Sequence, residues 1–174
     1  MSGRRYLRIG VGAGLMVGTM LAGNVAAVVD PDGPWTPAIQ QVDTALARKE
    51  YSAALRAAND AYSLALGSTR WDGMVSAGDL YRRIGDATGL KRSFEAKARE
   101  AYQKAYFRAR QQASVEGVLR SVEGYAALGD TQMVGVGLRV AERLAARDPE
   151  ALADVRAFRI RMGDPSITAG EIRQ

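Results

Sequence analysis

The residue types that most often carry out chemistry in proteins are missing from this chain of 174 residues. It has no cysteine, which excludes disulfides, thiolate nucleophiles, thiolate metal sites and a lipid-modified cysteine. It has no histidine, which removes the commonest general base and the commonest transition-metal ligand. Most hydrolase triads and zinc sites are thereby excluded, and the sequence predicts no catalytic residue, no metal ligand and no cofactor.

Two weaker patterns for chemistry also fail. The glycines between Gly10 and Gly14 could cradle a phosphate, but no Lys-Ser or Lys-Thr pair follows them and no strand precedes them. Acid–base catalysis by paired carboxylates needs opposed groups in a closed pocket, and nothing in the sequence implies one. An accessory enzyme that uses a glutamate, similar to a transglycosylase, is therefore a remote alternative, and we expect a protein that is not an enzyme.

A basic and aromatic stretch at residues 90–112 could bind an anionic polymer or lipid. It interleaves Tyr102, Tyr106 and Phe107 with seven cationic side chains, namely Lys91, Arg92, Lys97, Arg99, Lys104, Arg108 and Arg110. The simpler interpretation is a long amphipathic helix with buried aromatics and solvated charges. We prefer that interpretation, although the role of this basic helix stays open.

The net charge gives little support for a nucleic-acid partner. The chain carries 24 Lys and Arg against 19 Asp and Glu, a formal charge of +5. Without Arg4, Arg5 and Arg8 in the N-terminal segment, 21 basic residues face 19 acidic ones. A body of nearly balanced charge is not typical of a nucleic-acid-binding domain.

Residues 1–29 have the layout of a signal peptide or an N-terminal membrane anchor. Residues 1–8 are basic, an apolar run from Ile9 to Ala22 follows, and Val25-Ala26-Ala27 offers a cleavage site before Val28. Uncleaved, residues 9–29 are long enough to cross a bilayer and would anchor the protein. Both alternatives place the body outside the cytoplasm, because positive charge stays inside, so we expect a periplasmic or cell-envelope location.

The rest of the chain reads as a short linker, a helical domain at residues 37–163 and a C-terminal tail at residues 164–174. Residues 30–36 combine prolines, aspartates and a glycine, and Thr36-Pro37 is typical of a helix start. Helical periodicity then predicts seven helices and no strand. They run over about residues 37–49, 51–66, 70–84, 90–112, 115–128, 131–147 and 149–162, with Gly85 and Gly129 as stops.

Small and aromatic residues recur at matching spacings in these helices. Helix 70–84 carries Met74, Ala77, Gly78 and Tyr81 before a Gly85-Asp86 turn, and Tyr125 before Gly129-Asp130 repeats the end of that pattern. The second helices of two pairs carry a ladder of small residues with an aromatic: Tyr51, Ala54 and Ala61 in one, and Ala98, Tyr102 and Ala105 in the other. Small residues allow close helix packing, and aromatics fill the space between pairs.

These spacings resemble the tetratricopeptide repeat family over residues 37–162. The resemblance implies an all-α fold, a right-handed superhelical stack of antiparallel helix pairs with three repeats and a C-terminal capping helix. It also implies an adaptor or scaffold that binds a protein or peptide partner in its concave groove. The first repeat lacks the motif in its first helix, and residues 87–94 look like an insertion. A plain helical bundle is the alternative fold.

In such a stack the first helix of each pair lines the groove. Projecting that surface onto this chain gives six charged candidates for partner binding, namely Asp43, Asp79, Arg82, Arg83, Glu116 and Glu123. The arginines could grip a carboxylate, and the acids could receive a basic partner. The charges could instead pair with one another. The alternative function is a structural subunit of an envelope or membrane-associated assembly, which packs or self-associates through its repeats.

Overall fold

The computed structural model describes residues 33–163, which form seven α-helices and no strand. The helices are α1 (Thr36–Ala47), α2 (Tyr51–Gly67), α3 (Asp72–Thr88), α4 (Lys91–Gln111), α5 (Val115–Ala127), α6 (Thr131–Ala145) and α7 (Pro149–Arg161). The all-α prediction is confirmed for this part of the chain, and the helix boundaries lie within a few residues of those predicted. The predicted signal or anchor at residues 1–29 and the tail at residues 164–174 fall outside the described residues.

Short polar residues cap the N-termini of the last three helices. The Ser114 hydroxyl accepts a hydrogen bond from the Gly117 amide (3.0 Å) at the start of α5. Asp130 accepts from the Met133 amide (3.1 Å) at the start of α6, and Asp148 begins α7 in the same way. Gly129 has a φ of 72°, a left-handed conformation that favours glycine, and it ends α5 as predicted.

Two predicted helix boundaries are wrong. Gly85 does not stop α3: the helix continues to Thr88, and Gly89, with a φ of 73°, ends it. The reason is packing, because a Cβ at Gly85 would lie only 3.2 Å from the Cβ of Phe94 on α4, so the glycine provides room inside the helix. At the other end, Thr36 is the first residue of α1 rather than its N-cap, a position that Trp35 holds.

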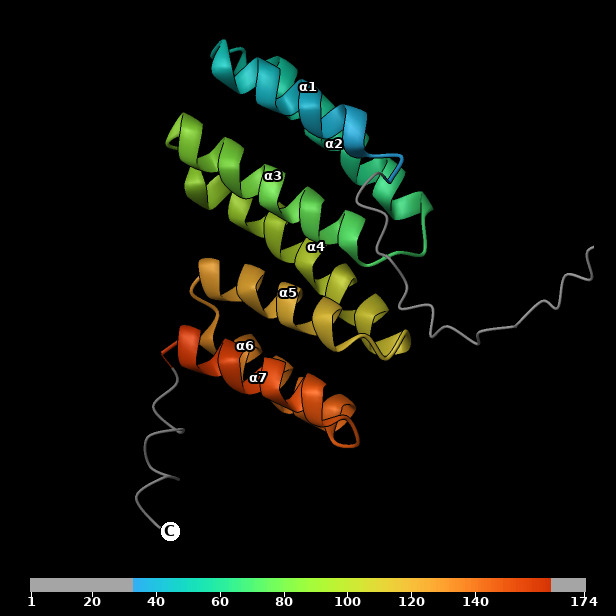
Figure 1. Cartoon of the computed structure of the whole chain (residues 1–174). Coiled ribbons are helices and arrows are strands. Elements are labelled where there is room, and N and C mark those ends of the chain that lie inside the picture. Colours follow the sequence, from blue (N-terminus) through green and yellow to red (C-terminus); the bar gives the residue numbers. More distant parts are fainter. Residues whose placement is uncertain (1–32, 164–174) are drawn as a thin grey trace, which may run out of the picture.

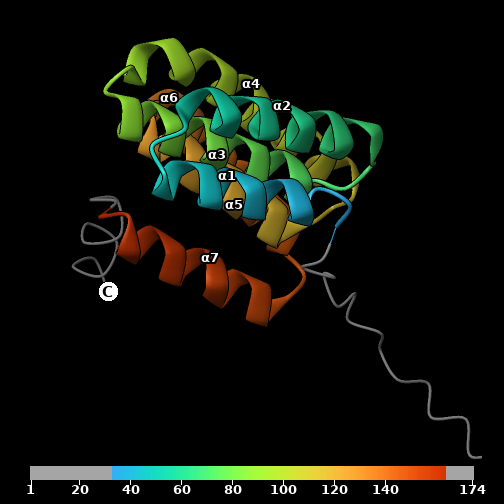
Figure 2. The ribbon, with the colours of Figure 1, turned by 90° about the horizontal axis from the view of Figure 1, so that it is seen from above.

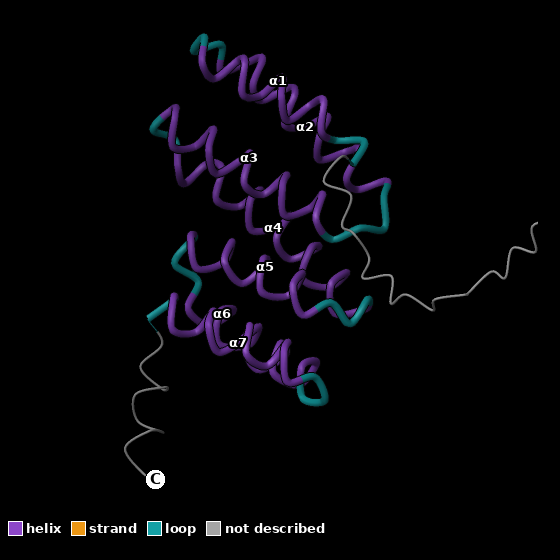
Figure 3. Tube along the Cα trace, viewed as in Figure 1, coloured by secondary structure: helices purple, strands orange, loops and turns teal. Residues whose placement is uncertain are grey.

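The helices form successive antiparallel neighbours joined by short turns (Figure 1, Figure 3). Each helix contacts the next, and the odd-numbered helices also contact one another: α3 touches α1 and α5, and α5 touches α7. Viewed from above, α7 lies on the side of α1 and α5, opposite α2 and α4 (Figure 2), and it contacts α6 as well as α5. The first helix of each pair and α7 therefore share one side of the molecule.

Glycines and alanines bring these helices close together. Tyr102 of α4 is fully buried, and its ring lies against Gly78 of α3 and Gly124 of α5. Of the apolar, small and aromatic residues predicted to pack at the repeat spacings, ten are buried: Ala54, Ala61, Met74, Ala77, Gly78, Tyr81, Ala98, Tyr102, Ala105 and Tyr125. Tyr51 is the exception. It is the first residue of α2 and 37 % exposed, so the prediction that it packs between helices is wrong.

Both tryptophans belong to the core. Trp35 is 2 % exposed, and its ring covers Gly73 of α3, so residues 33–35 are part of the folded domain and not of a linker. Trp71 is the N-cap residue of α3, and its ring lies against Gly117 of α5. It therefore packs at the junction of the second and third helix pairs.

Candidate binding groove

The surface shared by α3, α5 and α7 is hollowed along its length. A groove of about 590 Å³ lies between α5 and α7, and a smaller one of about 230 Å³ lies between α3 and α5. Arg120 and Glu123 line both. A third hollow of about 200 Å³ near the end of α3 shares Arg82 and Ala127 with the second. The three hollows are therefore neighbours along α5, and the third also takes Lys91 and Glu95 from α4; we call this row of hollows the groove.

Four of the six predicted partner-binding residues line this groove. Asp79 and Arg82 line its α3–α5 part, Glu116 lines its α5–α7 part, and Glu123 lines both parts. Asp43 and Arg83 line none of the three hollows. They form an ion pair with each other across α1 and α3, so the fold uses these two charges internally.

A buried hydroxyl ties Asp79 to the core beneath the groove. The Tyr102 hydroxyl donates a hydrogen bond to Asp79 Oδ1 (2.7 Å), and Arg82 Nη2 lies 3.7 Å from the same oxygen. Burial, with Asp79 beside it, raises the pKa of Tyr102 well above its usual value, so the phenol stays a neutral donor. Asp79 and Arg82 are therefore held in place by contacts of the fold itself.

The sequence interpretation missed the wall that α7 contributes. The α5–α7 groove is lined by Ala151, Asp154, Ala157, Phe158 and Arg161 of this helix, opposite Leu119 and Arg120 of α5. Leu119 and Phe158 are largely buried and form an apolar floor, whereas Asp154 and Ala157 are exposed. The helical spacing of Ala151, Asp154 and Phe158 could have indicated one face, had α7 been treated as a groove helix instead of a cap.

Several cationic side chains of α4 form hydrogen bonds within the domain and so are already used by the fold. Arg108 donates to the carbonyl oxygens of Ala65 (2.8 Å) and Leu66 (2.9 Å) at the end of α2 and of Arg70 (2.9 Å) in the loop before α3. Lys104 donates to Glu100 Oε1 (2.7 Å), and this hydrogen bond raises the pKa of Lys104. These contacts agree with the amphipathic-helix interpretation of residues 90–112.

Hydrogen bonds from Lys104 and then from the Tyr62 hydroxyl (2.8 Å) lower the pKa of Glu100 below its ordinary value. The three side chains join α2 to α4 on the side of the molecule opposite the groove.

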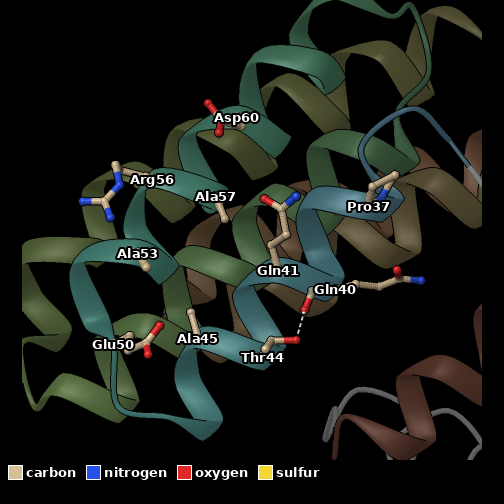
Figure 4. A pocket seen from close by; sticks show the side chains of 10 residues that line it. All are labelled: Pro37, Gln40, Gln41, Thr44, Ala45, Glu50, Ala53, Arg56, Ala57 and Asp60. Carbon is tan, nitrogen blue, oxygen red and sulfur yellow. Dashed lines mark hydrogen bonds between the residues drawn. The ribbon is translucent and has the colours of Figure 1, made fainter.

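A separate hollow, of about 610 Å³, lies on the outer face of the first helix pair, away from the groove. Figure 4 shows Gln40, Gln41 and Thr44 of α1 beside Arg56 and Asp60 of α2 around it. The Thr44 hydroxyl turns back to donate to the Gln40 carbonyl oxygen (2.9 Å). Neutral polar groups and charges of both signs surround a floor of alanines, which is typical of the polar end of a helical stack.

Within residues 33–163, no three His, Cys, Asp or Glu side chains gather as ligands of a metal ion. No helix there has both the length and the apolar character needed to cross a bilayer. The described part of the chain is thus an all-helical domain with an open, charged groove. Comparison with protein families, with curated proteins and with solved structures gives no match for this chain.

Proposed function

We propose that this chain is an exported, non-catalytic adaptor that holds a protein or peptide partner in the groove of α3, α5 and α7. The observation that carries the proposal is the row of neighbouring hollows along α3, α5 and α7, with buried apolar residues beneath it and charges along it. An open groove of this kind suits an extended or helical segment of a partner protein. Export rests on the pattern of residues 1–29.

The proposed fold is a tetratricopeptide-like right-handed superhelical stack. Its three repeats are the pairs α1–α2, α3–α4 and α5–α6, and α7 closes its C-terminal end. Three features support it: contacts among the odd-numbered helices, the buried small and aromatic residues at repeat spacings, and the glycines at which Tyr102 packs. Such a stack places the odd-numbered helices on the concave side, where partners bind.

The test is to block the groove without disturbing the core. Ala157 and Ala127 are exposed alanines that line the groove, and Ala153 is exposed on α7 outside it. We expect Ala157→Trp and Ala127→Trp to abolish crosslinking of partners to the full chain in its own cell envelope, and Ala153→Trp to leave it unchanged. Partners that remain crosslinked in both groove variants would refute the proposal.

The alternative, a structural subunit of an envelope assembly, has one observation in its favour. Leu64 and Leu66 of α2 and Phe107 of α4 are large apolar side chains that are nearly half exposed on the even-numbered helices. Exposed apolar residues of this size can mark an interface. Sedimentation of the purified chain decides: an oligomer that dissociates in Phe107→Ser would favour the subunit.

A further inference from the structure

The α5–α7 groove holds two carboxylates that the fold does not neutralise. Glu116 of α5 and Asp154 of α7 are exposed and line opposite walls, and neither has an ion-pair partner within residues 33–163. Glu116 lies in the first turn of α5, where the helix dipole stabilises it. Asp154 lies in the middle of α7 and has no such helix-end effect.

The cations of the same groove are already engaged. Arg120 forms an ion pair with Glu123 on its own helix. The Arg161 guanidinium lies 5.0 Å from the centre of the Phe158 ring, within the range of a cation–π contact. Arg120 and Glu123 thus pair with each other, and the groove keeps the carboxylates of Glu116 and Asp154 against one cation, Arg161, so its net charge is negative.

An apolar floor runs between these carboxylates. Leu119 and Phe158 are buried at the base, and Val115 and Ala151 are half-buried at the end near Glu116. A volume of about 590 Å³ is in the range of sites that enclose a small ligand or several side chains. The α1–α2 hollow is different, since glutamines and a threonine line it and Arg56 offsets its acids.

We infer that the α5–α7 groove binds a peptide segment of a partner protein in which an apolar side chain is flanked by lysine or arginine. The apolar side chain would pack against Leu119 and Phe158, and the cations would lie against Glu116 and Asp154. Charge complementarity decides the partner, because a cation next to both carboxylates gains attraction that an acidic segment would lose. This inference rests on the proposed adaptor function and specifies the chemistry of its partner.

The experiment uses the full chain and two fluorescein-labelled peptide amides. One has the order lysine, leucine, alanine, leucine, lysine, and the other has glutamate in place of lysine. We expect the lysine peptide to bind about tenfold more tightly at low salt, as two exposed ion pairs would give. The preference should shrink at 1 M salt, where charges are screened within about 3 Å. Fluorescence anisotropy measures both.

Two matched variants locate the site. Glu116→Gln with Asp154→Asn removes the two groove charges without changing side-chain size, and we expect it to erase the preference for the lysine peptide. Glu50→Gln with Asp60→Asn removes two exposed acids of the α1–α2 face, and we expect it to change nothing. Circular dichroism of both variants should match the original chain, because all four side chains are exposed.

The outcomes separate this inference from the proposed function. Equal binding of both peptides, or a preference that survives Glu116→Gln with Asp154→Asn, overturns the inference and leaves the adaptor intact. If neither peptide binds, but Ala157→Trp still abolishes crosslinking of partners, the inference falls and the adaptor proposal stands. If neither peptide binds and the tryptophan variants keep their partners, both proposals fall.

Two other occupants would also overturn the inference. A second copy of the chain is the occupant if sedimentation finds a dimer that Glu116→Gln with Asp154→Asn dissociates. The chain's own tail is the occupant if a chain ending at Gly163 binds the lysine peptide and the full chain does not.

Discussion

Adding one methyl group at Gly78 tests the packing on which the whole fold depends. A Cβ there would lie 2.4 Å from Cε1 of Tyr102, whereas carbon atoms in unstrained contact lie about 3.5–4.0 Å apart. The ring would have to move by about 1 Å. It meets α5 as well, since a Cβ at Gly124 would lie 2.5 Å from the same ring edge. Its hydroxyl is also held by Asp79.

The magnitude follows from two opposing effects. Overpacking a filled core costs about 1–3 kcal/mol, and the confined ring places Gly78→Ala near the upper end. Alanine in place of a helical glycine stabilises by up to about 1 kcal/mol. We therefore expect Gly78→Ala to lower the free energy of unfolding by about 2 kcal/mol. Urea unfolding followed by circular dichroism at 222 nm measures it.

The matched control is Gly135 of α6. A Cβ there would meet nothing nearer than the flexible end of Arg139, at 3.6 Å. Gly135→Ala should raise the free energy of unfolding by about 0.5–1 kcal/mol. The reasoning would be refuted if both alanine variants were equally stable. It would also be refuted if Gly78→Ala cost as much after Tyr102→Leu, which removes the outer ring atoms and should relieve the clash.

Two further predictions concern the contacts between helix pairs. Arg108→Ala removes three hydrogen bonds to carbonyl oxygens at the end of α2 and in the loop before α3, and it should lower the free energy of unfolding by about 1–3 kcal/mol. Arg92 is exposed on the same helix, and Arg92→Ala should change this free energy by less than about 0.5 kcal/mol. Equal thermal stability of the two variants would contradict this prediction. Burial raises the pKa of Tyr81 to about 12, above its ordinary value of 10, so the unfolded chain loses this proton at lower pH than the folded chain. The contribution of Tyr81 to the free energy of unfolding is therefore complete below pH 10 and is lost between pH 10 and 12. In this range the free energy of unfolding should fall by about 1.4 kcal/mol per pH unit because of this tyrosine. Urea unfolding at a series of pH values measures the slope, and an unchanged slope in Tyr81→Phe would exclude Tyr81 as its cause.

The sequence predicts the core well because the core depends on local spacing. Ala54, Ala98 and Ala105 belong to sets of small residues at helical intervals, and such a pattern indicates a helix face that packs closely against another helix. The same logic fails at helix ends. Gly85 has the sequence of a stop, but its conformation is decided by Phe94 on the following helix, which no local pattern reveals.

Errors at the edges of the domain have a related cause. Composition assigned Trp35 to a linker because prolines and a glycine surround it, yet its ring finds a buried place against Gly73, far along the chain. Tyr51 fits the repeat spacing but belongs to the first pair, which has no earlier pair to pack against. Its ring therefore stays exposed, as expected at the end of a stack.

The groove was only half predictable, because charge pairing depends on the assembled fold. Asp43 and Arg83 are equally good binding candidates in the sequence, but in the structure they form an ion pair with each other. Asp79 is held by a hydroxyl from α4. Asp154 attracts no attention in the sequence, yet it faces the groove without a partner in the described residues.

A charged side chain that already forms an ion pair must break that pair before it can bind a partner, and this costs free energy. A side chain without an ion pair has no such cost. A partner that takes Arg82 must compete with Asp79, and one that takes Arg120 must compete with Glu123. A partner that meets Glu116 and Asp154 displaces only water. Discrimination between partners should therefore come from the α5–α7 end of the groove, whereas the α3–α5 end, whose charges pair with one another, should add little charge selectivity.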